Sequence, residues 1–125
     1  MSRLIGLSTQ EIQKNRMHVT TEFAKKHSAL LLLKGAPSLI GTPEGNIYIN
    51  STGNPGMSTG GSGDVLTGII AGLAAQNISL QNAAIAGAYI HGLSGDLFSE
   101  KETQTSLIAG DLLRCLPDAL KQILP

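Results

Sequence analysis

The sequence predicts an α/β fold, and three of its stretches carry that prediction. Ser8-Thr9-Gln10-Glu11 is a capping box, and it opens a helix that we expect to run to about Lys26. The unbroken apolar run from Ala29 to Leu33 follows that helix, as is typical of a strand buried on both faces of a parallel sheet. A glycine-rich loop, Asn54 to Asp64, then leads into an apolar helix that begins near Gly63.

The composition is that of one globular domain with few charged groups. The chain has 125 residues, of which 42% are hydrophobic and 14% are charged, and its formal net charge is zero. This balance argues against a nucleic-acid partner or a membrane surface held by bulk charge. A single cysteine, Cys115, rules out an internal disulfide and fits a reducing compartment. Because there is neither a membrane-length apolar run nor a signal peptide, we expect a cytoplasmic protein.

Periodicity and turn residues predict the elements of the first half of the chain. Thr42-Pro43-Glu44-Gly45 has turn chemistry, so residues 38–40 and 46–50 should form a hairpin. The first helix should separate an apolar stripe from a solvent face. The stripe comprises Ile12, Val19 and Phe23, and the solvent face comprises Lys14, Arg16, Glu22 and Lys25.

Two helices should follow the glycine-rich loop and pack tightly against each other. The first should run to about Ala75, with Gly68 and Gly72 letting another backbone approach it. The second should run from about Leu80 to Phe98, after Ser79 as N-cap. Its face of small residues comprises Ala84, Gly87, Ala88, His91 and Gly95. We interpret the histidine on that face as a hydrogen-bonded core residue.

The last part of the chain should hold two shorter helices. The first is expected from Leu107 to about Cys115. A proline disfavours the α conformation of the residue before it, so this helix should end ahead of Pro117. Pro117 would then begin a final helix that reaches Leu124.

The glycine-rich loop is the strongest candidate for a functional site. Glycine lets backbone N–H groups crowd together and point at one place, and a helix N-terminus adds unpaired donors and partial positive charge. The loop therefore predicts an anion site. Asp64 would take a proton from a hydroxyl that attacks a phosphoryl centre, or it would only cap or charge the first helical turn. The residues alone leave both roles open.

A second candidate, Lys34-Gly35-Ala36-Pro37-Ser38, follows the predicted buried strand. Open α/β sheets bind ligands at the carboxyl ends of their strands, so Lys34 would be placed to meet a phosphate. A lysine that only extends from a strand end into water explains the residue equally well.

Several familiar site chemistries do not fit this sequence. Asp64 and Val65 follow Gly63 where a P-loop has Lys and Ser or Thr, and Leu66 stands where a dinucleotide fingerprint has its third glycine. Ser62 is not in a nucleophile elbow, and no histidine has a visible claim to partner it. No zinc or EF-hand spacing is present, so the residues predict no dedicated metal site.

The run from Asn54 to Leu66 closely resembles the signature of the ADP/ATP-dependent NAD(P)H-hydrate dehydratases, which belong to the ribokinase-like superfamily. Its Gly-x-Gly-Asp core alone would indicate only the superfamily, whereas the Asn-Pro-Gly-Met lead-in is more specific. The resemblance continues in Leu33-Lys34-Gly35-Ala36-Pro37, in Tyr89-Ile90-His91-Gly92 and in Gly95-Asp96. It implies that residues 1–125 are the C-terminal half of a ribokinase-like three-layer α/β/α sandwich.

The resemblance implies an enzyme that repairs NADH and NADPH whose nicotinamide ring has taken up water, at the expense of ADP or ATP. It makes Asp64 the catalytic base that meets the hydrated nicotinamide. It assigns nucleotide binding to Lys34, Gly35, Ala36, Pro37, Ser38 and Gly63. The N–H groups of Gly61, Ser62 and Gly63 would form the anion hole. The resemblance also implies Mg²⁺ as cofactor and a homo-oligomer, often a tetramer.

Two other functions stay open. A ribokinase-like kinase for a vitamin precursor or a sugar hydroxyl would share the anion hole and the Asp base. A non-catalytic nucleotide-binding half-domain would fit a chain that matches only the C-terminal half of the family's domain. For that reason we expect the 125-residue chain alone to be inactive or weakly active. The strand at Leu30 to Leu33 would then present an apolar edge prone to association.

Overall fold

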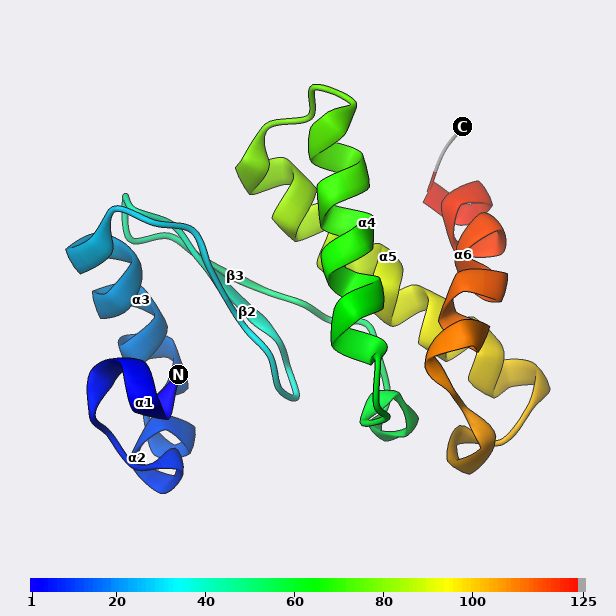
Figure 1. The fold of residues 1–125 in the computed structure, drawn as a ribbon, viewed down its shortest axis with the longest axis horizontal. Helices are drawn as coiled ribbons and strands as arrows, with labels where there is room; N and C mark the ends of the chain where they lie inside the picture. Colours follow the sequence, from blue (N-terminus) through cyan, green and yellow to red (C-terminus); the bar gives the residue numbers. More distant parts are fainter. Residues whose placement is uncertain (124–125) are drawn as a thin grey trace. The chain divides into compact units, whose positions relative to one another are not determined.

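The computed structural model describes residues 1–123, and the chain divides into two compact units between Ile49 and Asn50. Each unit is described by itself. Figure 1 follows the chain from the first helices and strands of unit 1 to the three long helices of unit 2.

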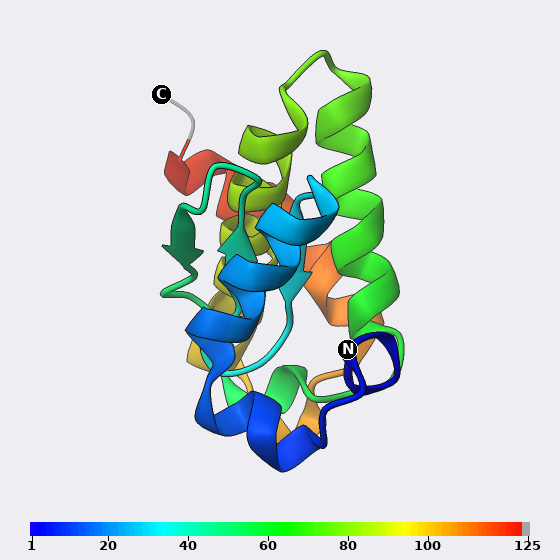
Figure 2. The same ribbon diagram turned by 90° about the vertical axis from the view of Figure 1, so that its left-hand side faces the viewer.

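Unit 1 is a small antiparallel sheet covered by one helix. Figure 2 shows α3 (Arg16–His27) lying across a face of the sheet, and this helix contacts all three strands. The strands are ordered β1 (Leu31–Leu33), β2 (Leu39–Gly41) and β3 (Ile47–Ile49). The elements of unit 1 are α1 (Ser2–Ile5), α2 (Thr9–Lys14), α3 (Arg16–His27), β1 (Leu31–Leu33), β2 (Leu39–Gly41) and β3 (Ile47–Ile49).

The capping box forms as predicted, but the helix that it opens is short. Ser8 Oγ accepts from the N–H of Glu11, and Glu11 Oε2 accepts from the N–H of Ser8. Hydrogen bonds from Ser8 lower the pKa of Glu11 below its usual range. The single helix expected to Lys26 was wrong, because Asn15 leaves the helical conformation at φ −130° and ψ 34°. Asparagine is a poor helix former, since its short polar side chain competes for backbone hydrogen bonds.

The hairpin was predicted correctly, and the setting of the first strand was not. Leu39 pairs with Ile49, and Gly41 pairs with Ile47, on either side of the predicted turn. β1 pairs antiparallel with β2, and its three leucines are only half-buried. An apolar run shows that a strand is shielded from water but not which way its neighbours run. The expectation of a parallel strand buried on both faces is therefore corrected.

Unit 2 is built around its longest helix, which contacts the helices on both sides of it in the sequence (Figure 1). Ile90 and Leu97 of that helix form a buried apolar cluster with Ala119. The elements of unit 2 are η1 (Pro55–Met57), α4 (Ser62–Ala75), α5 (Leu80–Lys101), η2 (Gln104–Ser106) and α6 (Ala109–Ile123).

The small-residue face of α5 lets neighbouring segments approach its backbone. A Cβ atom at Gly87 would lie 2.6 Å from Ile70 Cγ1 on α4, so only glycine fits there. The expected close approach at Gly68 and Gly72 was wrong, because a Cβ added at either position would meet nothing within 4 Å. The close contact between α4 and α5 therefore depends on Gly87 of α5.

α6 continues through Pro117, which corrects the predicted break after Cys115. An interior proline removes one backbone hydrogen bond and costs about 3 kcal/mol. The apolar face that packs against Ile90 and Leu97 continues on both sides of the proline, with Leu116 before it and Leu120 after it. The carbonyl group that loses its donor belongs to Leu113, which is exposed, so it can reach water. The predicted helix end at Leu124 lies outside the described residues.

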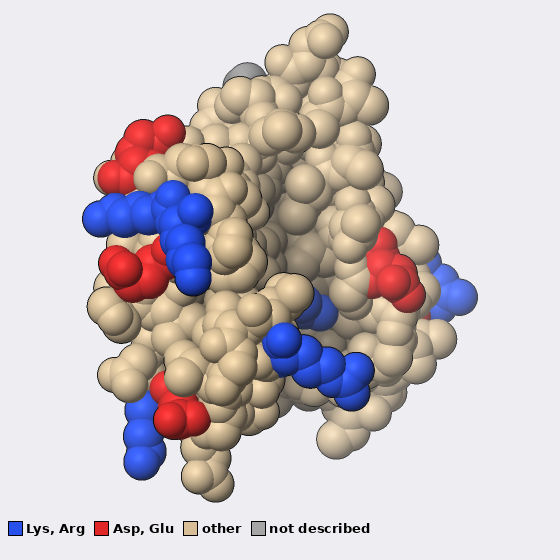
Figure 3. Space-filling model, turned by 60° about the vertical axis from the view of Figure 1, so that its left-hand side comes forward, with Lys and Arg blue, Asp and Glu red and all other residues tan. Residues whose placement is uncertain are grey.

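The described helices include none that is long and apolar enough to cross a membrane. On the face drawn in Figure 3, acidic and basic side chains alternate and most of the surface is uncharged. This agrees with the neutral composition.

Candidate functional site

The glycine-rich loop has a defined conformation that delivers the chain into α4. Asn54 caps the short helix η1, because its Oδ1 accepts from the N–H of Gly56 over 3.1 Å. Gly61 is the N-cap of α4 and has φ 85° and ψ −14°, a left-handed conformation that suits glycine. Any residue other than glycine would be strained at this position of the turn.

Two N–H groups at the start of α4 are available to a ligand. The N–H of Asp64 donates to the carbonyl of Gly61 over 3.0 Å, and the N–H of Ser62 makes a longer bond of 3.4 Å to Thr59. The N–H groups of Gly61 and Gly63 have no hydrogen-bond partner among the described residues. Unpaired donors at the positive end of a helix are the features that bind a phosphate.

The carboxylate of Asp64 lies on the first turn of α4 and is exposed to solvent. It forms no hydrogen bond and no ion pair with any other described side chain or backbone group. The helix has no side-chain cap, so Asp64 does not act as one. A free carboxylate beside unpaired N–H donors can accept a proton from a bound hydroxyl.

Ser62 and His91 form a buried contact that sequence reasoning missed. Nε2 of His91 lies 2.9 Å from the carbonyl oxygen of Ser62 and 3.3 Å from its Oγ. The carbonyl oxygen can only accept, so the shorter contact requires a proton on Nε2. That nitrogen then has no lone pair to take the proton of the Ser62 hydroxyl. His91 is therefore the core histidine expected from the sequence, and it fixes the first residue of α4.

The segment before the loop is held along α5 by side chains that no sequence motif had marked. Nδ2 of Asn50 donates to the carbonyl of Ala88 over 3.2 Å, and Oγ1 of Thr52 donates to the carbonyl of Tyr89 over 2.8 Å. These bonds fix the path of the chain toward Asn54. Polar residues in a loop give no sequence signal for such pairings, because the partners lie far away along the chain.

In unit 1, the second candidate segment forms a closed turn after β1. Oγ of Ser38 donates to the carbonyl of Gly35 over 3.2 Å, and the N–H of Gly35 approaches the same Oγ at 3.4 Å. Lys34 is exposed. Its side chain therefore extends from the strand end into solvent, where it can meet an anion.

Arg16 supports this turn from α3, although the sequence had placed it on the solvent face. Its Nη2 donates to the carbonyls of Leu33 and Lys34, each over 3.3 Å. A Cβ atom at Gly35 would overlap the guanidinium group, so the glycine makes room for it. No described carboxylate pairs with Arg16. The arginine therefore places a positive charge beneath the turn.

The described residues include no group of three or more metal-ligating side chains that could hold an ion. A magnesium ion that arrives with a nucleotide needs only one or two carboxylates in addition to the phosphates. Such an ion would be held chiefly by the phosphates of the nucleotide, so the lack of a ligand group among the described residues does not conflict with it.

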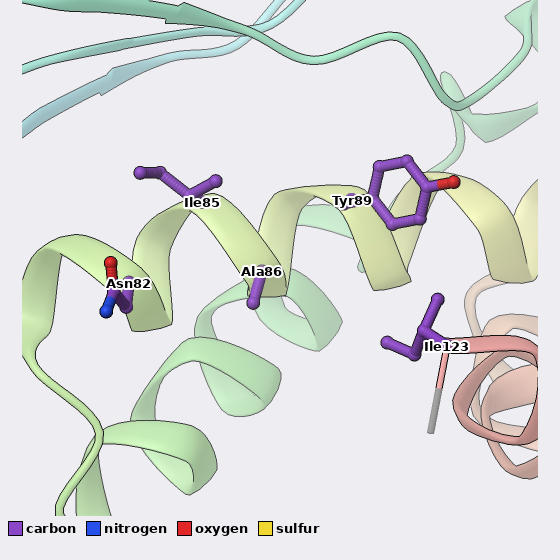
Figure 4. A pocket seen from close by; sticks show the side chains of 5 residues that line it. All are labelled: Asn82, Ile85, Ala86, Tyr89 and Ile123. Atoms are coloured by element: carbon purple, nitrogen blue, oxygen red, sulfur yellow. The ribbon is translucent and has the colours of Figure 1, made fainter. Parts of the chain in front are cut away.

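An open apolar groove of about 380 Å³ lies elsewhere on unit 2 and takes no part in this site. Figure 4 shows its lining, which comprises Asn82, Ile85, Ala86, Tyr89 and Ile123. None of these side chains carries a charge, so the groove does not suit a nucleotide phosphate.

Comparison with known structures places the fold among the ribokinase-like proteins. A crystal structure of an ADP/ATP-dependent NAD(P)H-hydrate dehydratase from Bacillus subtilis, crystallised with ATP and Mg²⁺, matches 97% of this chain with a TM-score of 0.94 and 31% identity. A ribokinase-like protein of Enterococcus faecalis matches 97% of the chain with a TM-score of 0.78 and 33% identity. The chain covers 45% and 40% of those two proteins.

Sequence comparison narrows this class to one family. A family described as NAD(P)H-hydrate dehydratase matches residues 1–118. A bifunctional NAD(P)H-hydrate repair enzyme of Moorella thermoacetica is 50% identical over 123 residues, which are 98% of this chain and 23% of that protein. The ADP-dependent (S)-NAD(P)H-hydrate dehydratase of Bacillus subtilis is 32% identical over 96% of this chain and 44% of its own length. The chain belongs to the NAD(P)H-hydrate dehydratase family, and it spans less than half the length of each of these relatives.

Proposed function

We propose that this protein takes part in the nucleotide-dependent dehydration of hydrated NADH and NADPH, with Asp64 as the base. The observation that carries the proposal is the free Asp64 carboxylate beside the unpaired N–H groups of Gly61 and Gly63. Family membership over residues 1–118 supports the choice of substrate. The free carboxylate favours the role of base over that of a hydrogen-bonded helix cap, and its charge in the first turn of α4 is compatible with that role.

The chemistry follows from the poor leaving ability of hydroxide. Asp64 takes the proton of the hydrate's hydroxyl as its oxygen attacks the terminal phosphoryl group of ADP or ATP. The N–H groups of Gly61 and Gly63 stabilise the charge that develops on the transferred group. The lone pair of the ring nitrogen then expels phosphate, and loss of a proton from the adjacent ring carbon restores the dihydronicotinamide. The products are NADH or NADPH, inorganic phosphate and the shortened nucleotide.

The turn after β1, in unit 1, is the second segment to which we assign a role in binding. We assign nucleotide binding to the segment Lys34 to Ser38, with Lys34 as the charge that meets a phosphate. Arg16 holds this turn through the carbonyls of Leu33 and Lys34. A magnesium ion bound with the nucleotide would neutralise part of the phosphate charge.

A kinase that shares the anion hole is the second candidate function. Both enzymes would use Asp64 in the same first step, and they differ in what becomes of the phosphorylated product. The dehydratase releases phosphate and regenerates the reduced cofactor, whereas a kinase accumulates a stable phosphate ester. The dehydratase signature from Asn54 to Leu66 favours the first outcome.

The test is a chimera in which this chain replaces the matching 123 residues of the Moorella thermoacetica enzyme. Supplied with hydrated NADH and either ADP or ATP, the chimera should regenerate NADH absorbance and release one phosphate for each NADH. A stable phosphate ester would indicate the kinase. Nucleotide binding without turnover, in a chimera whose fold is intact by circular dichroism, would indicate a non-catalytic half-domain.

Three further measurements test the activity of the chain alone, its oligomeric state and its location in the cell. Assay of the 125-residue chain alone tests the expectation that it has little or no activity, and full turnover would contradict it. Light scattering tests the proposed homo-oligomer, for which we expect a tetramer. Cell fractionation tests the proposed cytoplasmic location.

A further inference from the structure

Asp96 on α5 binds the lead-in to the glycine-rich loop through both of its carboxylate oxygens. Oδ2 accepts from the N–H of Gly53 over 2.8 Å, and Oδ1 accepts from Nδ2 of Asn54 over 3.0 Å. Asn54 in turn caps η1 through the N–H of Gly56. Asp96 is half-buried, and no described cation pairs with it. Its charge is stabilised instead by the two N–H donors of the loop.

Glycines on α5 let the lead-in segment, which we define as residues 50–57, lie directly against this carboxylate. A Cβ atom at Gly92 would overlap Thr52, and one at Gly95 would overlap the side chain of Met57. The segment therefore has little room to shift along the helix. A carboxylate on α5 whose two oxygens both bind one loop segment is suited to fix that segment in register.

We propose that Asp96 is a positioning residue, which holds Gly53 and Asn54 so that the loop presents its N–H groups and Asp64 in the geometry for phosphoryl transfer. It acts through Asn54 and η1 on the loop that follows, and it does not touch the reacting atoms. The catalytic part of this inference rests on the proposed function. The structural part, that Asp96 orders residues 58–64, does not depend on the proposed function.

Exchange of the two side chains tests the contact itself. Asp96→Asn places an amide NH₂ against the NH₂ of Asn54, and Asn54→Asp places a second carboxylate against Asp96. The double variant Asn54→Asp/Asp96→Asn restores every bond: the carboxylate at position 54 accepts from position 96 and from Gly56, and the amide oxygen at position 96 accepts from Gly53. Each single change should therefore be harmful and the pair should be rescued.

The readout is amide hydrogen exchange in the full 125-residue chain. Gly53 reports the contact, and Ser62, Asp64 and Val65 report the loop, because their N–H groups are bonded to Thr59 and Gly61. Asp96→Asn should speed exchange at these four amides about tenfold, while the middle of α6 changes by less than about threefold. The double variant should return them to within about threefold of wild type. Asp118→Asn, which removes a half-buried carboxylate from α6, is the matched control and should change none of them.

Two results would overturn the inference. If Asp96→Asn speeds exchange at Gly53 but leaves Ser62, Asp64 and Val65 unchanged, Asp96 is only a local anchor. If the double variant does not restore the loop, the paired contact is not what orders it. This second criterion still decides the question if a single variant loses its fold, because the rescue is then scored on folding and exchange together.

Turnover in the chimera separates this inference from the proposed function. If the chimera with the wild-type residues turns over, Asp96→Asn should lower its kcat about tenfold and change its KM for nucleotide by less than about threefold. The double variant should restore kcat. If wild type does not turn over, the proposed function fails while the exchange data still judge the ordering of the loop by Asp96.

Discussion

His91 Nε2 donates to the carbonyl oxygen of Ser62 over 2.9 Å, and this bond ties the middle of α5 to the first residue of α4. Both residues are buried, with exposed fractions of 6% and 2%. Loss of the donor would leave a buried carbonyl without that partner at the point where the proposed anion site begins.

Replacement of His91 should therefore destabilise unit 2. His91→Ala should lower the free energy of unfolding by about 2–4 kcal/mol, through the lost bond and the cavity left behind. His91→Gln keeps an N–H donor near the position of Nε2 and should recover more than half of that loss. Urea denaturation measures both, with His18→Ala as an exposed control. Equal losses for His91→Ala and His91→Gln would show that packing, not the hydrogen bond, is what matters.

Neighbouring glycines of the loop should respond differently to alanine. Gly61→Ala forces a left-handed conformation and brings the new Cβ to 3.1 Å from Ala109 Cβ. It should cost about 1–2 kcal/mol and weaken binding of ADP. A Cβ at Gly60 meets nothing within 4 Å, so Gly60→Ala should stay within about 1 kcal/mol of wild type. Thermal unfolding and calorimetric titration with ADP check the pair, and equal behaviour of the two variants would contradict the assigned turn.

Arg16 should matter for nucleotide binding through the turn that it supports. Nη2 of Arg16 makes both bonds to the carbonyls of Leu33 and Lys34, and a lysine side chain ends one bond short of that position, so it should not reach both carbonyls. Arg16→Lys and Arg16→Ala should both raise the Kd for ADP about tenfold, measured by calorimetry. Lys14→Ala, at an exposed position of α2, is the control. Wild-type affinity in Arg16→Lys would show that a positive charge alone suffices.

Alkylation of Cys115 should require a higher pH than alkylation of the unfolded chain. Burial raises the pKa of the Cys115 thiol, while the Lys101 charge opposes that shift. The folded state therefore binds the thiol proton more tightly, and stability should fall as pH rises through the usual thiol range. Lys101→Ala should move the alkylation profile further upward. A profile for the folded protein at or below that of the urea-unfolded chain would contradict the burial.

The sequence predicted the elements whose signals are local. The capping box at Ser8, the hairpin around Pro43 and the helix that follows the glycine-rich loop all depend on residues within a few positions of one another. The path of α6 through Pro117 could not be predicted in this way, because it depends on packing against Ile90 and Leu97 of α5.

In the candidate site, too, the residues that are close together in the sequence could be predicted and the distant pairings could not. The glycines and Asp64 stand together in one motif, so the loop was visible in the sequence. The side chains that hold the two segments are distant from them along the chain, as Asp96 is from Gly53 and Arg16 is from Lys34. Arg16 also lies at a helical position that periodicity assigns to solvent. Such pairings follow from the tertiary fold and not from spacing.

The measurement that tests the account most directly is turnover of the Asp64→Asn chimera with hydrated NADH and ADP. Asp64 is exposed and without a partner among the described residues, so the change should leave thermal unfolding within about 0.5 kcal/mol of wild type. Removal of a negative charge from the proposed anion site should keep or improve ADP affinity. We predict that NADH regeneration falls at least about a hundredfold, as expected for a lost general base. Turnover near the wild-type rate would contradict the role of Asp64.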